Sequence, residues 1–203
     1  MRERKGTRAL ILLLAVALVA LIASTIAGCS SPDDRLKTAT DSTGFFHIKF
    51  PAEWQHTIEA GLISVYASDA LPESDRLEDP ALLIFLSEQP MDQPVPDLLT
   101  ELIESRAADR EWREGYTISE PETVTVGGRD AARVTASGVD RNGVEFESEY
   151  YLVRTDGREI LVMAVAPSGE WDDFSTEVAR ILSDDWYWHI PEQSQEPTST
   201  PAD

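Results

Sequence analysis

Two glycine turns late in the chain constrain its fold more than any other feature. Asn142-Gly143 and Asp156-Gly157 interrupt three long segments that are rich in apolar and β-branched residues, 130–139, 144–154 and 158–166. Asn-Gly and Asp-Gly supply the positive φ angles that two-residue hairpin turns of type I′ require. The sequence therefore predicts three consecutive antiparallel strands joined by two tight hairpins.

The second of these turns also predicts a register. With Asp156-Gly157 as a two-residue loop, apolar residues pair across the hairpin on both of its faces. The expected pairs are Val153 with Ile160 and Tyr151 with Val162 on one face, and Leu152 with Leu161 and Tyr150 with Met163 on the other. Because both faces are apolar, each needs a covering layer.

Two amphipathic segments are predicted to supply these layers. Residues 95–109 and about 170–183 each carry apolar side chains at helical spacing along one side. Further strands are expected at Phe45–Phe50, Leu62–Ser68, Ala81–Ser87 and Thr117–Val126, the last followed by a Gly127-Gly128 hairpin turn. The predicted fold is α+β, an antiparallel sheet of five to seven strands with helices on both faces.

The first thirty residues have the order of an export signal. A basic head is followed by an uncharged apolar run from Ala9 to Ile22 and then by small residues. Ile26-Ala27-Gly28-Cys29 resembles the lipobox of bacterial lipoproteins, in which the Cys thiol receives a diacylglycerol and a signal peptidase cuts just before it. The resemblance implies that Cys29 is the lipidation site and the first residue of the mature chain.

An uncleaved membrane anchor over Ala9–Gly28 stays open as an alternative, because its 20 residues are long enough to span a bilayer. Both interpretations place residues 30–203 outside the cytoplasm and beside the cell membrane. The expected organisation is a signal peptide at 1–28, a flexible polar tether at 29–44, a folded domain at 45–190 and a disordered polar tail at 191–203.

The charge of the chain excludes one class of partner. The 203 residues contain 17 Lys+Arg against 37 Asp+Glu, a formal net charge of -20. Phosphate neutralisation needs a basic surface, so we expect no nucleic-acid binding. An acidic domain is also repelled by anionic lipid headgroups, so the predicted lipid must supply the membrane affinity.

A family resemblance rests on the segment Phe46-His47-Ile48-Lys49-Phe50-Pro51-Ala52-Glu53-Trp54, a short strand followed by Pro, two residues and Trp. This segment resembles the opening of PsbP-like domains, and the expected order of elements over residues 44–188 is similar as well. The chain also resembles lipoproteins of the DcrB type. The resemblance implies an α/β/α sandwich that binds or assembles a membrane complex. The best known members serve photosystem II and dock through basic residues, which does not suit so acidic a chain.

Alternating acidic residues on one strand are a candidate cation site. Glu145, Glu147 and Glu149 share a face at spacings of about 7 Å. Asp140, expected to pair across from Glu145, is the most plausible additional ligand. Carboxylate oxygens suit Ca²⁺, and Mn²⁺ also accepts them. The alternative is a solvated strand end.

Three consecutive aromatic residues are a candidate partner site. Trp186, Tyr187 and Trp188 follow the second predicted helix. They can fold back over the core, form a binding patch for another protein, or touch the bilayer interface, where Trp and Tyr are favoured. In a strand, Trp186 and Trp188 would share one face and Tyr187 would lie on the other.

Catalytic patterns are not found in the sequence. The three His residues show no ligand spacing, no nucleophile elbow occurs, and the single Cys is assigned to lipidation. We therefore expect a lipid-anchored, non-enzymatic binding or assembly domain for an envelope or membrane protein complex. An acidic lipoprotein that binds Ca or Mn is the alternative, and an uncatalogued enzyme would need a pocket with a perturbed titratable group.

Overall fold

The structure is a computed structural model that describes residues 35–72, 79–87, 92–109, 116–140, 142–155 and 157–189. The predicted lipidation site Cys29, the signal peptide at 1–28 and the tail at 191–203 lie outside these residues. The folded body begins at Leu36. No helix among the described residues has both the length and the apolar character needed to cross a bilayer.

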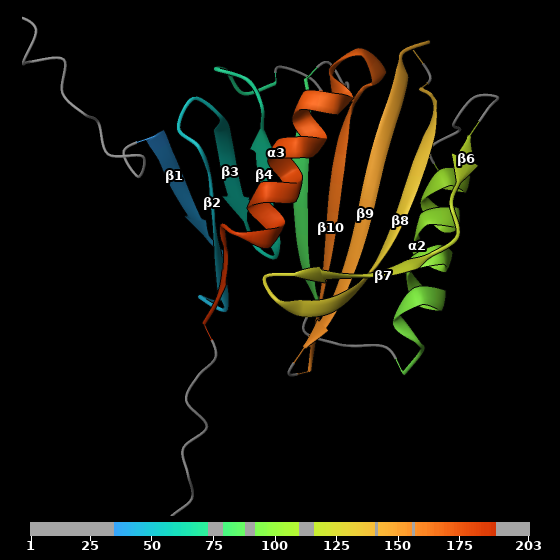
Figure 1. Cartoon of the computed structure of the whole chain (residues 1–203), viewed down its shortest axis with the longest axis horizontal. Coiled ribbons are helices and arrows are strands. Elements are labelled where there is room, and N and C mark those ends of the chain that lie inside the picture. The colour runs from blue at the N-terminus through green and yellow to red at the C-terminus, as the bar shows by residue number, and fades with distance from the viewer. Residues whose placement is uncertain are drawn as a thin grey trace, which may run out of the picture. The chain divides into compact units, whose positions relative to one another are not determined.

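Among the described residues, eight antiparallel strands form the main sheet (Figure 1). Their order is β3-β4-β5-β10-β9-β8-β6, and β7 pairs with another stretch of β8. Their bounds are Gln55–Glu59 (β3), Leu62–Tyr66 (β4), Ala81–Ser87 (β5), Thr117–Ile118 (β6), Glu122–Val126 (β7), Arg129–Val139 (β8), Glu145–Thr155 (β9) and Arg158–Pro167 (β10).

The last hairpin has the predicted register. Ile160 pairs with Val153 and Val162 with Tyr151, and the residues between them pair on the opposite face as expected. The turn at Gly127-Gly128 is also confirmed, because both glycines have positive φ and Val126 pairs with Arg129 across them.

The turn at Asn142-Gly143 is longer than predicted. The Asp140 N–H donates to the Val144 carbonyl at 2.9 Å, and Glu145 pairs with Val139 rather than with Asp140. The cause is the Asp140 carboxylate, which accepts hydrogen bonds from the backbone N–H groups of Asn142 and Val144. Such a side chain stabilises a turn that starts at Asp140 itself, in which Gly143 takes a positive φ.

A helix covers each face of the main sheet, as predicted (Figure 1). Helix α2 (Val95–Asp109) packs on β8 and β9, and α3 (Trp171–Ser183) packs on β10 and β7. The two buried clusters on opposite faces reflect the alternation of β8, β9 and β10, whose successive side chains point to opposite sides. The α3 cluster includes Phe174, Val178 and Ile181, and the α2 cluster includes Leu98, Leu99 and Ile103.

A second sheet of three strands was not predicted. It has the order β1-β2-β11, with bounds Leu36–Thr40 (β1), Phe46–Pro51 (β2) and Trp186–Trp188 (β11). β1 lies inside the segment expected to be a flexible tether at 29–44, so that expectation is wrong for Leu36–Thr40. Its sequence is mostly polar, and Ala39 is its one fully buried residue, which leaves little apolar pattern to detect.

The number of strands in the main sheet also exceeds the predicted five to seven. β3 reads Gln-His-Thr-Ile-Glu, a polar strand with no buried residue. The expected strand Thr117–Val126 is split into β6 and β7, with Pro121 between them. Proline lacks the N–H that a continuous ladder requires, so the pairing with β8 is interrupted there.

Candidate functional site

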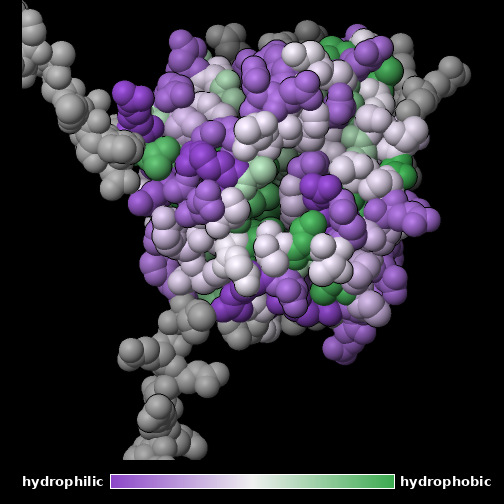
Figure 2. Space-filling view, in the orientation of Figure 1, coloured by the Kyte–Doolittle hydropathy of each residue, from purple (hydrophilic) through white to green (hydrophobic). Residues whose placement is uncertain are grey.

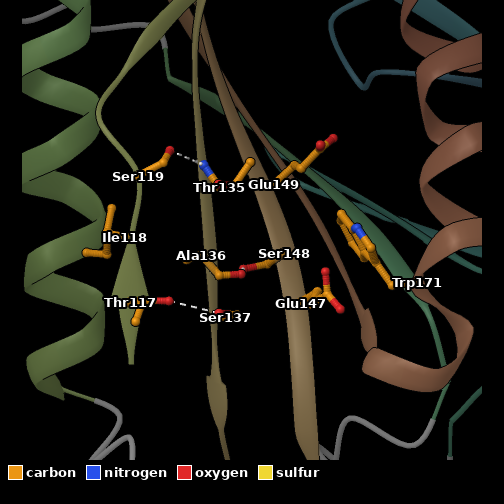
Figure 3. A pocket seen from close by; sticks show the side chains of 10 residues that line it. All are labelled: Thr117, Ile118, Ser119, Thr135, Ala136, Ser137, Glu147, Ser148, Glu149 and Trp171. Carbon is orange, nitrogen blue, oxygen red and sulfur yellow. Dashed lines mark hydrogen bonds between the residues drawn. The ribbon is translucent and has the colours of Figure 1, made fainter. Parts of the chain in front are cut away.

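A groove of roughly 420 Å³ opens on the α3 face of the main sheet (Figure 3). Alternation along β8 and β9 directs their polar side chains to this face, beyond the part of the sheet that α3 covers. The residues of β6, β8 and β9 line the sheet side of the groove, and Trp171, the first residue of α3, lines the side that faces the helix. The lining residues are Thr117, Ile118, Ser119, Thr135, Ala136, Ser137, Glu147, Ser148, Glu149 and Trp171.

The hydroxyl groups of the groove hold its floor together. The Thr117 and Ser137 hydroxyls are 2.8 Å apart, and Ser119 Oγ accepts the Thr135 N–H at 3.0 Å (Figure 3). Ser148 Oγ donates to the Ala136 carbonyl at 3.1 Å. These bonds tie β6, β8 and β9 together, so the floor is preformed before any ligand arrives.

Glu149 belongs to a charged network at one side of the groove. Its carboxylate accepts the Tyr151 hydroxyl and lies 3.5 Å from Arg133, which is also bonded to Glu122. Burial and the hydrogen bond to Glu149 raise the pKa of Tyr151 above its ordinary value of 10.0. The phenol therefore stays neutral and remains a donor to Glu149 at neutral pH.

Glu147 differs from Glu149 in having no hydrogen bond or ion pair within the described part of the chain. It is half-buried, and Figure 3 shows its side chain extending from β9 toward Trp171. A carboxylate without a donor favours a ligand that donates hydrogen bonds or carries positive charge, and an indole face favours a cation or an apolar group. Anionic ligands are repelled from such a groove.

The four carboxylates predicted to bind a cation are not gathered into one site. Glu145 is exposed, Glu149 is paired with Arg133, and Asp140 is occupied by its own turn. Burial alone would raise the pKa of Asp140, but hydrogen bonds from Val144 and Asn142 outweigh it and lower the pKa. Across the described ranges, no three His, Cys, Asp or Glu residues lie close enough to hold a metal ion.

Two of the three predicted partner-binding aromatics lie inside the domain. Trp186 is 4% exposed and stacks on Phe46, with ring centroids 4.7 Å apart. Trp188 is half-buried against Phe45 and Phe46. As expected for a strand, Tyr187 points the other way and is 39% exposed. Trp186 and Trp188 therefore pack against the core, and Tyr187 is the most exposed of the three.

Comparison with known proteins identifies the fold. No family model matches the sequence, and no curated protein matches it. Among solved structures, cyanobacterial PsbP (CyanoP) from Synechocystis is similar at a TM-score of 0.58, with 12% identity over 80% of this chain and 96% of that one. The domain has the PsbP-like fold.

Two further structures share the PsbP-like fold at TM-scores of 0.52. LpqN of Mycobacterium tuberculosis, involved in cell envelope biogenesis, is 14% identical over 78% of this chain and 94% of its own. The Saccharomyces cerevisiae Ran-binding protein Mog1p is 9% identical over 75% and 95%. At such identities the likeness shows the fold alone.

The PsbP-like domain also places side chains together that sequence reasoning missed. On the outer face of the three-stranded sheet, His47 stacks on Tyr187 with ring centroids 4.7 Å apart. His47 Nδ1 lies 2.6 Å from His189 Nε2, and Lys49 Nζ lies 5.3 Å from the Tyr187 ring centroid. The alternation of Phe46–Pro51 indicates that His47 and Lys49 share a face. Their contacts with Tyr187 and His189, about 140 positions later, cannot be inferred from any local sequence pattern.

Sequence reasoning also missed Trp171 at the groove wall and Arg133, which pairs with Glu149 beside the groove. Trp171 opens the second predicted helix, and it is half-buried at the groove wall and only partly packed against the core. Arg133 lies on β8 between small apolar residues, and its partners Glu122 and Glu149 come from strands on either side.

Proposed function

We propose that this chain is a non-enzymatic binding domain that acts outside the cytoplasm, anchored to the cell membrane by a lipid on Cys29. Its groove receives a basic side chain of another envelope or membrane protein and so helps to assemble a complex. The observation that carries the proposal is the half-buried Glu147 carboxylate, which faces Trp171 and has no partner among the described residues.

The chemistry of the groove supports a basic partner. A Lys or Arg side chain that enters it would lie between an acceptor and an aromatic face, and both favour a cation. The net charge of -20 attracts basic segments over a longer range. Figure 2 shows that the face seen in Figure 1 is mostly hydrophilic, with small scattered apolar areas, so a broad hydrophobic contact is not the basis of recognition there.

The solved structures add support at the level of precedent. One protein with this fold takes part in cell envelope biogenesis and another binds a protein, Ran. Cell envelope biogenesis and protein binding are thus functions in which proteins of this architecture take part elsewhere. The lipobox-like Ile26-Ala27-Gly28-Cys29 supports a place beside the membrane.

The binding half of the proposal is tested by cross-linking in native membranes. Glu147→Gln and Trp171→Ala should each lose the cross-linked partner that the unaltered chain retains. Glu145→Gln is the matched control, because Glu145 lies on the same strand and face but is exposed and outside the groove. Capture that survives both groove variants, with unchanged melting temperatures, would contradict the assignment.

The anchoring half is tested separately by intact-mass analysis. The expected product starts at Cys29 and carries acyl chains, and Cys29→Ala should leave the chain unprocessed and unacylated. A chain that starts at Met1 and stays in the membrane after Cys29→Ala would favour the uncleaved anchor. Recovery of unmodified protein from the cytosol would refute both forms of anchoring.

A further inference from the structure

The outer face of the three-stranded sheet carries a second site, distinct from the groove. We propose that His47 and His189 bind one divalent transition-metal ion, with Cu²⁺ the preferred metal. His47 coordinates through Nδ1 and His189 through Nε2, the two atoms that face each other at 2.6 Å. Water completes the coordination, since no third His, Cys, Asp or Glu of the described residues joins the pair.

The separation of the two nitrogens favours a tetragonal ion. Metal–nitrogen bonds of about 2.0–2.1 Å place two ligands at right angles about 2.9 Å apart, and two tetrahedral ligands about 3.3 Å apart. The observed 2.6 Å is a hydrogen bond between the two rings, so they must part by about 0.3 Å for the right-angled arrangement and by about 0.7 Å for the tetrahedral one. Cu²⁺ and Ni²⁺ take the right-angled geometry with nitrogen and oxygen ligands, and Cu²⁺ binds most tightly of the divalent series.

The backbone holds both rings in place. His47 lies in the middle strand of the three-stranded sheet, and the His189 N–H donates to the Phe45 carbonyl at 2.7 Å, directly after β11. Tyr187 stacks on His47 and limits the rotation of its ring. The two imidazoles are therefore held side by side on the sheet surface, and metal binding requires only a small increase in the distance between them.

Metal binding needs a lone pair on each of the two facing nitrogens. In the metal-free protein one imidazole N–H bridges to the other nitrogen. On binding, that ring transfers its proton through water to its second nitrogen, and both lone pairs then face the ion.

The test is a titration of the purified full-length chain, without an added histidine tag, with CuCl₂. Calorimetry should show one saturable Cu²⁺ per chain, and the electron paramagnetic resonance spectrum should show coupling to two imidazole nitrogens. His47→Ala and His189→Gln should each remove this binding event. His56→Ala is the matched control, because the third histidine packs edge-on against Phe50 and stays apart from the pair.

Each alternative outcome decides the question. Equal Cu²⁺ binding by the unaltered chain and by both pair variants would overturn the proposal, and so would a spectrum without imidazole coupling. Any Cu²⁺ held by the chain terminus appears equally in all variants and is subtracted by the comparison. His189 follows the last strand, so His189→Gln keeps the test valid even where His47→Ala lowers the melting temperature. Lys49→Gln should tighten binding, because it removes a neighbouring positive charge.

Discussion

The indole N–H of Trp188 donates a hydrogen bond to the carbonyl oxygen of Gly127, 3.0 Å away. Gly127 in turn donates its N–H to the Leu182 carbonyl at 2.7 Å. One glycine at a hairpin turn therefore joins the last strand and the end of α3. A Cβ at this position would lie 2.6 Å from both Trp186 Cδ1 and Trp188 Nε1, so the close approach requires a residue without a side chain.

Gly127→Ala should destabilise the protein more than Gly128→Ala. Both glycines have positive φ, which costs an L-residue about 1–2 kcal/mol. Only at Gly127 does the new methyl group also meet two indole rings, which adds about 1–3 kcal/mol of overpacking. Urea unfolding of the two variants measures the difference. Equal losses would show that the indoles move aside without cost.

Trp186→Ala should lower the free energy of unfolding by about 3–5 kcal/mol, because it removes a large, buried ring from the stack on Phe46. Tyr187→Ala, one residue later on the solvent side, should cost less than about 1 kcal/mol. Thermal and chemical denaturation of both variants provide the check. A large loss at Tyr187 would contradict the assignment of this residue to the surface.

Stability should fall as the pH rises above the ordinary pKa of tyrosine, partly through Tyr151. The folded state raises the pKa of Tyr151 above 10.0, so at higher pH the unfolded chain releases a proton that the folded chain keeps. The stabilisation from Tyr151 is fully present below pH 10 and is lost progressively as the pH rises above 10. Tyr151→Phe, which cannot ionise, should show a shallower alkaline loss. Melting curves from about pH 8 to 11 test this, and parallel curves for the two proteins would refute it.

Arg154→Met should cost about 1–3 kcal/mol, because Arg154 is bonded to the buried Glu159 and also donates to the Gln93 carbonyl at 2.7 Å. Loss of the guanidinium leaves the Glu159 carboxylate, which is only 6% exposed, with fewer groups to stabilise its negative charge. The matched control is Glu122→Gln, which breaks an ion pair to Arg133 whose acid is 53% exposed and should cost less than about 1 kcal/mol. Equilibrium unfolding ranks the two, and a reversed order would contradict the argument from burial.

Local patterns predicted those elements whose residues are buried. The strands around Asp156-Gly157 and both helices were found because their apolar residues repeat at the spacing of their own element. β1 and β3 were missed because their residues are largely polar and half-exposed. Their strand form comes from pairing with β2 and β4, which is a tertiary effect.

The candidate sites were harder to predict, for a related reason. The spacing of Glu145, Glu147 and Glu149 was visible, but which of them lacks a partner depends on Arg133, from a neighbouring strand. The pairing of His47 with His189 depends on β11 joining β2, across almost the whole domain. Sequence spacing reveals neighbours within an element, whereas these contacts arise only when the chain is folded.

The place of β11 beside β2 sets the order in which the molecule is completed. A newly made polypeptide must extend through Trp188 before the strand that shields Phe46 and Ile48 exists. Until then, the apolar side chains of Phe46 and Ile48 lack the strand that covers them. Truncation shortly before Trp186 should therefore leave these apolar side chains exposed and give an aggregation-prone, protease-sensitive product.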